Sequence, residues 1–132
     1  MQTIKKIWVN GCFDVLHRGH IELLRFAKSQ GDHLVVGIDS DDRVRQNKGY
    51  KRPVNTQEDR KYFLEAITYV DEVTVFNDDS GLIESIRMCS PECMIIGSDW
   101  KGKKVIGSEH AKKLVFFDRV GSYSTTNILE QK

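Results

Sequence analysis

The fold of this chain is decided by residues 7–20, which read IWVNGCFDVLHRGH. The stretch begins with three large apolar residues, carries glycines at positions 11 and 19, and places His17 three residues before His20. This order is typical of a buried strand that turns through a glycine-containing loop into the first turn of a helix. We therefore expect a strand–loop–helix unit near the start of the chain.

Four further apolar runs repeat the strand pattern, and each is continuous rather than alternating, as in strands buried on both faces. These runs lie at residues 34–38, 73–76, 94–96 and 114–117. Strands that alternate with helices form right-handed crossovers and a parallel sheet. The sequence therefore predicts a single α/β domain over residues 1–132, a Rossmann-like doubly wound sheet of about five parallel strands with helices on both faces.

Helical segments are expected between the strands. The first should run from His20 to Gln30, and the second should begin at Thr56, a good N-cap, with Phe63, Ala66 and Ile67 on its inner face. Further helices are expected at 82–88, near 108–112 and from 125 to the C-terminus.

The composition excludes several classes of protein. With 20 Lys and Arg against 19 Asp and Glu, the formal net charge of +1 argues against electrostatic wrapping of nucleic acid. No apolar run approaches the ~18–20 residues of a membrane span or forms a signal peptide. The three cysteines, Cys12, Cys89 and Cys93, cannot all pair with one another, so we expect thiols. These features predict a cytoplasmic protein that binds neither nucleic acid nor a membrane.

The chemistry is expected just beyond the strand ends, because open parallel sheets bind ligands there. His17 and His20 stand at a helix N-terminus, whose backbone N–H groups and dipole suit phosphate oxygens. Their imidazoles could donate hydrogen bonds to a phosphoryl group in its transition state. Two alternatives remain open: a His-x-x-His metal site, for which Asp14 is the nearby carboxylate, and two histidines that merely cap the helix.

Residues 11–20, GCFDVLHRGH, resemble the signature G-x-F-D-x-x-H-x-G-H of the cytidylyltransferase-like nucleotidyltransferases at every defined position. Members of that family transfer a nucleoside monophosphate from CTP or ATP to a phosphorylated acceptor and release pyrophosphate. The resemblance implies that His17 and His20 are catalytic, binding the nucleotide phosphates and stabilising the transition state. It also implies a nucleotide site that includes Gly11, Cys12, Phe13, Asp14 and Gly19.

Residues 48–55, KGYKRPVN, predict a basic loop, which is more often simply solvated than functional. In the family, a lysine of this loop and an arginine of the following helix contact phosphates. The resemblance therefore implies a catalytic role for Lys48 and nucleotide binding by Arg60. Lys51 is expected to bind the acceptor, and Arg52 matches the family pattern less closely.

Two further segments follow strands. Residues 97–103 read GSDWKGK, and one interpretation is a turn with Trp100 packed on the core. By resemblance, the same residues form a pocket. Gly97 and Asp99 would then bind the nucleotide, and Trp100 and Lys103 the acceptor. Residues 119–126 carry a hydroxyl-rich helix start that an N-cap alone could explain. By resemblance, Arg119 there is catalytic, and Ser124 and Thr125 hold the β- and γ-phosphates.

The reaction implied is in-line attack by an acceptor phosphate oxygen on the α-phosphorus. A phosphate nucleophile is already an anion, so alignment and positive charge suffice, without a general base. Mg²⁺ is expected with the nucleoside triphosphate, held mainly by phosphate oxygens and water, with Asp14 as its nearest protein neighbour.

Substrate and assembly are predicted by resemblance alone. The GSDWKGK segment is similar to glycerol-3-phosphate cytidylyltransferases, and our main prediction is a CTP-dependent enzyme acting on a small phosphorylated polyol. The KG and RPVN motifs, with the later STTNI, are more similar to the heptose-1-phosphate adenylyltransferase domain, so transfer from ATP to a sugar 1-phosphate is the alternative. A non-catalytic nucleotide sensor is a third possibility. A homodimer is implied, for which Tyr62, Phe63 and Tyr69 could supply apolar surface unless they pack in the core.

Overall fold

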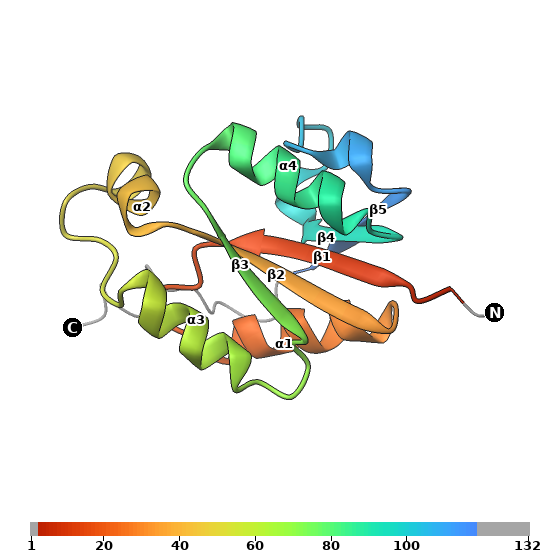
Figure 1. Ribbon diagram of the computed structural model, residues 1–132, viewed down its shortest axis with the longest axis horizontal. Helices are drawn as coiled ribbons and strands as arrows, with labels where there is room; N and C mark the ends of the chain where they lie inside the picture. The colour runs from red at the N-terminus through yellow and green to blue at the C-terminus, as the bar shows by residue number, and fades with distance from the viewer. Residues whose placement is uncertain (1–2, 119–132) are drawn as a thin grey trace.

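The computed structural model of the protein describes residues 3–118, which form a parallel sheet of five strands in the order β3-β2-β1-β4-β5 (Figure 1). Each strand contains one of the apolar runs, so the Rossmann-like α/β prediction is confirmed. The strands are β1 (Lys6–Gly11), β2 (His33–Asp39), β3 (Glu72–Phe76), β4 (Cys93–Gly97) and β5 (Lys113–Phe117).

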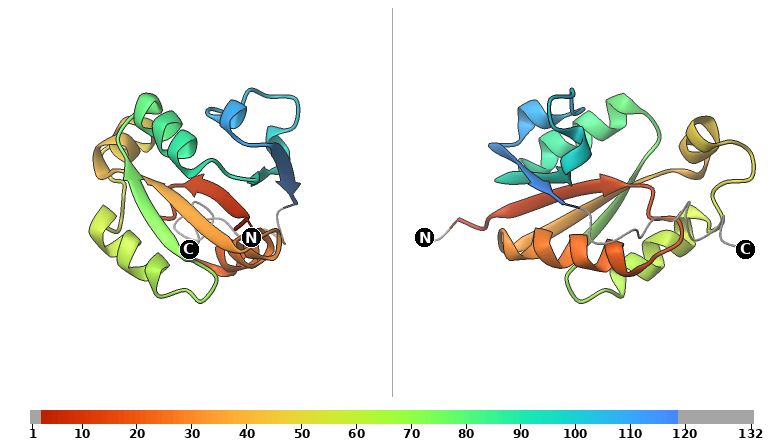
Figure 2. Two further views of the ribbon diagram at one scale, coloured as in Figure 1. Left: turned by 45° about the vertical axis from the view of Figure 1, so that its right-hand side comes forward. Right: turned by 180° about the vertical axis from the view of Figure 1, so that it is seen from behind.

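Helices cover both faces of the sheet, as predicted. Figure 2 shows α1 and α3 on one side and α4 on the other, while α2 follows the carboxyl end of β2. The helices are α1 (Arg18–Ser29), α2 (Asp41–Lys48), α3 (Gln57–Glu65) and α4 (Asp79–Cys89), with 3₁₀ turns η1 (Ser98–Trp100) and η2 (Ser108–His110).

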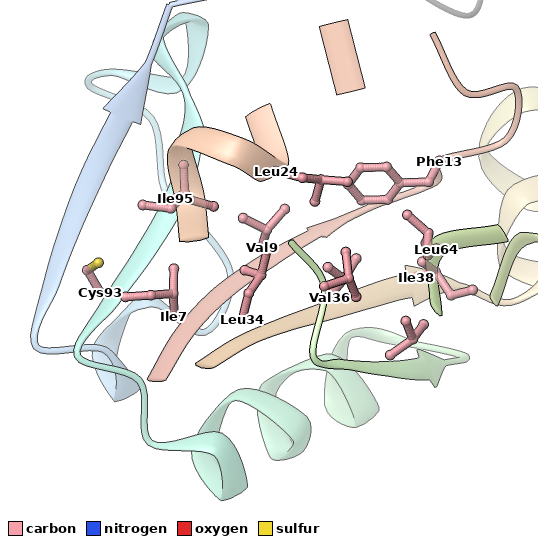
Figure 3. Close-up of a cluster of buried hydrophobic side chains, with 13 residues drawn as sticks. Ile7, Val9, Phe13, Leu24, Leu34, Val36, Ile38, Leu64, Cys93 and Ile95 are labelled. Carbon is pink, nitrogen blue, oxygen red and sulfur yellow. The ribbon is translucent and has the colours of Figure 1, made fainter. Parts of the chain in front are cut away.

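The alternation of side chains along β1 divides the core into two clusters. Ile7 and Val9 face α1 and α3, where Leu24 and Leu64 pack against them (Figure 3). Trp8 points to the opposite face, into the cluster beneath α4. β1 is therefore buried on both sides, as its continuous apolar run predicts.

Trp8 is fully buried because Gly37 on the neighbouring strand makes room for it. A Cβ atom at position 37 would lie 2.5 Å from Cζ2 of the indole. The indole N–H donates to Oδ1 of Asn10, 2.9 Å away, so its polar group is satisfied. At this register of β1 and β2, position 37 must therefore hold a residue without a side chain.

The second predicted helix exists, but its inner face was predicted wrongly. Arg60 and Leu64 are the buried residues of α3, whereas Phe63 is 42% exposed and Ala66 is also exposed. Ile67 packs against the core as expected. The error arose because a charged residue, Arg60, occupies a position on the buried stripe and displaces the apolar pattern.

Other expectations differ in detail. α1 begins at Arg18, two residues earlier than predicted, because His17 caps it. The helix α2 was not predicted at all, and the segment near 108–112 is one 3₁₀ turn. Cys89 and Cys93 are free and buried, as expected. The helix predicted from residue 125 lies outside the described residues, and within residues 3–118 no helix is long and apolar enough to cross a membrane.

Candidate active site

The ladder between β1 and β4 ends early, at the point where the strand order changes direction, and we call the region beyond the carboxyl ends of these two strands the crevice. β1 pairs with β2 along six residues, whereas its ladder with β4 contains Ile7↔Cys93 and Trp8↔Met94. Both strands continue beyond those pairs and end in glycine, at Gly11 and Gly97. The central strands therefore separate toward their carboxyl ends, which is where an open parallel sheet binds its ligand.

Phe13 shapes the loop that leaves β1. Its φ is +51°, a left-handed conformation that non-glycine residues rarely adopt, and its ring is buried beside Leu24 (Figure 3). A Cβ atom at Gly11 would lie 3.2 Å from Cε2 of this ring, so the glycine allows the loop to fold back over it. The Phe13 ring centroid is 5.2 Å from that of His20. Local backbone strain of this kind is common at functional sites.

The two histidines form a reciprocal cap at the N-terminus of α1. Nδ1 of His17 accepts from the backbone N–H of Gly19 at 3.0 Å, and Nδ1 of His20 accepts from the backbone N–H of His17 at 3.1 Å. The rings stack with their centroids 3.8 Å apart. Because each Nδ1 accepts, the proton of each neutral ring is on Nε2. The capping alternative is therefore correct for Nδ1 and compatible with donation from Nε2.

The metal alternative finds no supporting cluster in the described part of the chain. Among residues 3–118, no group of three or more His, Cys, Asp or Glu side chains is placed to hold a metal ion.

Asp14 fastens the basic loop to the start of α1. Its side chain is fully buried, and its carboxylate accepts from Nε of Arg52 at 2.9 Å and from the backbone N–H groups of Val54 and Asn55 at 2.8 Å each. Burial alone would raise the pKa of Asp14, but these hydrogen bonds outweigh it, and the pKa lies below its usual range. Asp14 therefore acts as a charged anchor, and its predicted proximity to Mg²⁺ stays a prediction.

Arg60 is a buried hub beneath the site. Its guanidinium donates to the carbonyl oxygens of Cys12, Asp39 and Asn55 and to Oδ1 of Asp41, at 2.7 to 3.1 Å. The side chain is 0% exposed. Arg60 holds the ends of β1 and β2 and the basic loop together, and its predicted contact with a nucleotide phosphate stays a prediction. Arginine suits this task because its five donors form a planar fork.

Cys12 accepts a hydrogen bond from Arg60 through its carbonyl oxygen, and its thiol is not reactive. Burial raises the pKa of the Cys12 thiol; Asp14 adds to this effect, whereas the charges of Arg60 and Lys48 oppose it. The net shift is upward, so the group is a thiol at neutral pH and not a nucleophile. Lys48 is the exposed last residue of α2. Lys51 is an exposed residue of the turn that follows α2.

The segment after β4 lies beside the crevice and is largely exposed. Oδ1 of Asp99 folds over Gly97, where a Cβ atom would lie only 2.6 Å from it. Trp100 is 44% exposed, so it is not a buried cover of the core. The ammonium of Lys103 lies 5.8 Å from the centroid of the Trp100 ring, a cation–π distance. Of the predicted site residues, Arg119, Ser124 and Thr125 lie outside the described residues.

Asn55 is a site residue that sequence reasoning missed. Its side-chain amide donates to the carbonyl oxygen of Asp14 at 2.7 Å, while its own backbone N–H binds the Asp14 carboxylate. The contact spans 41 positions of the chain, so no local pattern could reveal it. The available signal was its place two residues after Pro53, in a loop that the family resemblance already connects with phosphate binding.

Comparisons with known proteins identify the family of this chain. Residues 8–129 match the family described as cytidylyltransferase-like. The chain is 46% identical over 125 residues to the bifunctional protein HldE of Campylobacter fetus, and 46% identical over 127 residues to that of Sulfurimonas denitrificans. The two matches cover 95% and 96% of this chain, but only 27% and 26% of the length of those relatives.

A solved structure of similar fold is the lipopolysaccharide core biosynthesis protein of Thermoplasma volcanium. Its TM-score is 0.75 at 23% identity, and the match covers 90% of this chain and 100% of that one. The family model matches most of the chain, and the two histidines that the family signature requires stand at the N-terminus of α1. The chain therefore belongs to the cytidylyltransferase-like family of nucleotidyltransferases.

Proposed function

We propose that this chain transfers an adenylyl group from ATP to a sugar 1-phosphate of the heptose type and releases pyrophosphate. Two observations support this choice of substrates over CTP and a polyol phosphate. The loop KGYKRPVN is similar to the heptose-1-phosphate adenylyltransferase domain, which is often fused to a sugar kinase, and the relatives at 46% identity are bifunctional proteins. The main prediction from sequence, a CDP-glycerol-forming enzyme, gains no comparable support.

The observation that carries nucleotidyl transfer is the stacked pair His17 and His20 at the start of α1. Their tautomers place Nε2–H donors beside a helix N-terminus, where charge on a pentavalent phosphoryl group can be stabilised. An acceptor phosphate oxygen forms a bond to the α-phosphorus as the bond to the bridging oxygen of pyrophosphate breaks. No proton needs to be removed from the nucleophile, which fits a site that has donors and cations but no reactive thiol.

The remaining predicted roles complete the proposal. Lys48 and Arg119 neutralise the triphosphate, Ser124 and Thr125 hold its terminal phosphates, and Gly97, Asp99, Trp100 and Lys103 line the side toward β4. We expect the nucleotide to arrive as its Mg²⁺ complex, with the ion held by phosphate oxygens and water, because the oxygens of Asp14 already accept three hydrogen bonds. The reaction is expected in the cytoplasm, which supplies nucleoside triphosphates.

A pyrophosphate-release assay tests the proposal. ATP and CTP are each offered with heptose 1-phosphate and with glycerol 3-phosphate, and we expect release with ATP and the sugar phosphate. Pyrophosphate release with CTP and glycerol 3-phosphate would contradict the proposed substrates and support the main prediction from sequence. Nucleotide binding without pyrophosphate from any pair would favour a sensor.

We also propose a homodimer. Tyr62 is 71% and Phe63 42% exposed on α3, whereas Tyr69 is partly buried and packs against the core. Sedimentation should give a mass of twice 15.2 kDa for this chain, and Tyr62→Glu should lower it. A monomeric mass for the unaltered chain would contradict the proposal.

A further inference from the structure

Arg52 has a buried nitrogen atom that its surroundings do not satisfy. Among residues 3–118, Nη2 of Arg52 is the side-chain atom that is both shielded from solvent and without a hydrogen-bond partner. The side chain as a whole is 15% exposed. Buried polar groups are nearly always paired, so an unpaired guanidinium nitrogen requires an explanation.

The geometry of the Asp14 pair explains why Nη2 has no acceptor. An arginine and a carboxylate often form two parallel hydrogen bonds, but here only Nε of Arg52 binds Asp14, through Oδ2. Oδ2 also accepts from Val54, and Oδ1 is turned to the backbone N–H of Asn55. The carboxylate thus fixes one edge of the guanidinium and leaves Nη2 to another acceptor.

We infer that Nη2 of Arg52 binds a phosphate oxygen of one of the two substrates. The inference rests on the proposed function, since it assigns a further binding residue to that site. Asp14 accepts the hydrogen bond of Nε and so orients the guanidinium before the substrate binds. Little conformational entropy is therefore lost on binding.

The charges around Arg52 favour an anionic acceptor over a neutral one. Asp14 balances the charge of Arg52 itself, but Lys48 and Lys51 lie in the same basic segment. Val54 and Asn55 of this segment bind the Asp14 carboxylate, so the segment lies against the loop that leaves β1. Asp14 is also three residues before His17, so the pair connects Arg52 directly to the loop that carries the histidines. A phosphate oxygen would accept a hydrogen bond from Nη2, and its negative charge would be attracted by the basic segment.

The test compares Arg52→Lys with the unaltered chain and with Arg87→Ala. Lysine keeps the positive charge, but its single ammonium cannot replace two differently directed guanidinium nitrogens. Arg87 is a matched control because it is an exposed arginine on α4, paired with Glu84 and distant in the fold from the crevice. Thermal unfolding of each variant is measured first, so that the kinetics refer to folded protein.

We expect Arg52→Lys to raise KM about tenfold or more for one substrate, as for loss of a charge-assisted hydrogen bond, while KM for the other changes little. An increase confined to ATP places the oxygen on the triphosphate, and an increase confined to the sugar 1-phosphate places it on the acceptor. KM values within twofold of the unaltered chain for both substrates would overturn the inference. So would a fall in kcat with both KM values unchanged, since that pattern indicates an interaction made only in the transition state and not with a bound substrate.

The inference and the proposed function can fail separately. If the unaltered chain uses CTP and glycerol 3-phosphate, the same KM comparison is made with those substrates. If it releases no pyrophosphate, calorimetric binding of ATP and of heptose 1-phosphate replaces the kinetics. A tenfold loss of affinity for one of them in Arg52→Lys still supports the inference, and unchanged affinity for both overturns it.

Discussion

At the scale of single residues, each histidine of the signature uses one ring nitrogen for the helix cap and keeps the other for the catalytic role that we propose. Nδ1 of each ring accepts a backbone N–H and completes the helix cap, which leaves the proton on Nε2. Capping and catalysis can therefore be separated by substitution, because a serine can cap a helix without providing an imidazole donor.

We predict that His17→Ser lowers kcat about 100-fold, as for removal of one transition-state donor. The midpoint of thermal unfolding should change little, since serine is among the best N-cap residues. Steady-state pyrophosphate release and a melting curve measure the two quantities. Full activity in this variant would show that His17 serves the cap alone.

Arg60 shows how much a single side chain can organise. We predict that Arg60→Met lowers the free energy of unfolding by about 3–5 kcal/mol, because the buried carbonyls of Cys12, Asp39 and Asn55 and the carboxylate of Asp41 lose their donor. Urea denaturation measures the difference. The control is Arg45→Ala, which removes an exposed ion pair with Asp42 and should cost about 1 kcal/mol or less. Similar losses in both variants would contradict the role of a hub.

At the scale of elements, the sequence predicts strands that are continuous apolar runs, but it does not predict a polar helix or contacts between distant residues. The five strands were predicted because each is a run of aliphatic residues between turn signals. α2 was missed because Val44 is its one buried residue, so it has no apolar stripe. Its end signals were nevertheless present: Ser40 as N-cap, Asp41 and Asp42 in the first turn, and basic residues in the last.

The candidate site divides in the same way. The glycines and histidines of residues 11–20 form a local pattern, so their place at the end of β1 could be predicted. The contacts of Asp14 with Arg52, Val54 and Asn55 cross about forty positions, and the burial of Arg60 depends on carbonyls from three segments. No spacing rule encodes such contacts, because they are formed only when the loops meet in the folded chain.

The cap of α2 gives a test at this scale. Oγ of the buried Ser40 accepts from the backbone N–H of Arg43 at 3.2 Å. We predict that Ser40→Ala lowers the free energy of unfolding by about 1 kcal/mol, the usual value of an N-cap. Ser80→Ala, at an exposed position in the first turn of α4, is the control and should change stability by about 0.5 kcal/mol or less. Equal values from urea denaturation would show that the cap adds nothing.

At the scale of the whole molecule, two carboxylates, the buried Asp14 and the more exposed Asp71, connect segments that are distant in sequence. The pKa of Asp71 is also below its usual range: burial would raise it, but the ammonium of Lys28 and the backbone N–H of Leu34 outweigh burial. Asp14 and Asp71 therefore bind protons less readily in the folded chain than in the unfolded chain, where the pKa is about 3.9.

We predict that this difference makes the protein sensitive to acid. The stabilisation is complete above about pH 4 and is lost as the pH falls below that value through the lowered pKa values of the folded state. Melting temperatures measured from pH 6 to pH 2 should fall steeply below pH 4. Asp14→Asn should melt at a lower temperature near neutral pH and show a shallower acid slope, and an identical slope would contradict the role of Asp14.

The contrast between Trp8 and Trp100 makes the protein its own fluorescent reporter. Trp8 is sealed between the sheet and α4, whereas Trp100 is 44% exposed beside the crevice, and the chain has no other tryptophan. Iodide should therefore quench the emission of Trp100 and spare that of Trp8 until the core opens. A Trp100→Phe variant would isolate the core signal, so ligand occupancy and unfolding could be followed in one cuvette without an attached dye.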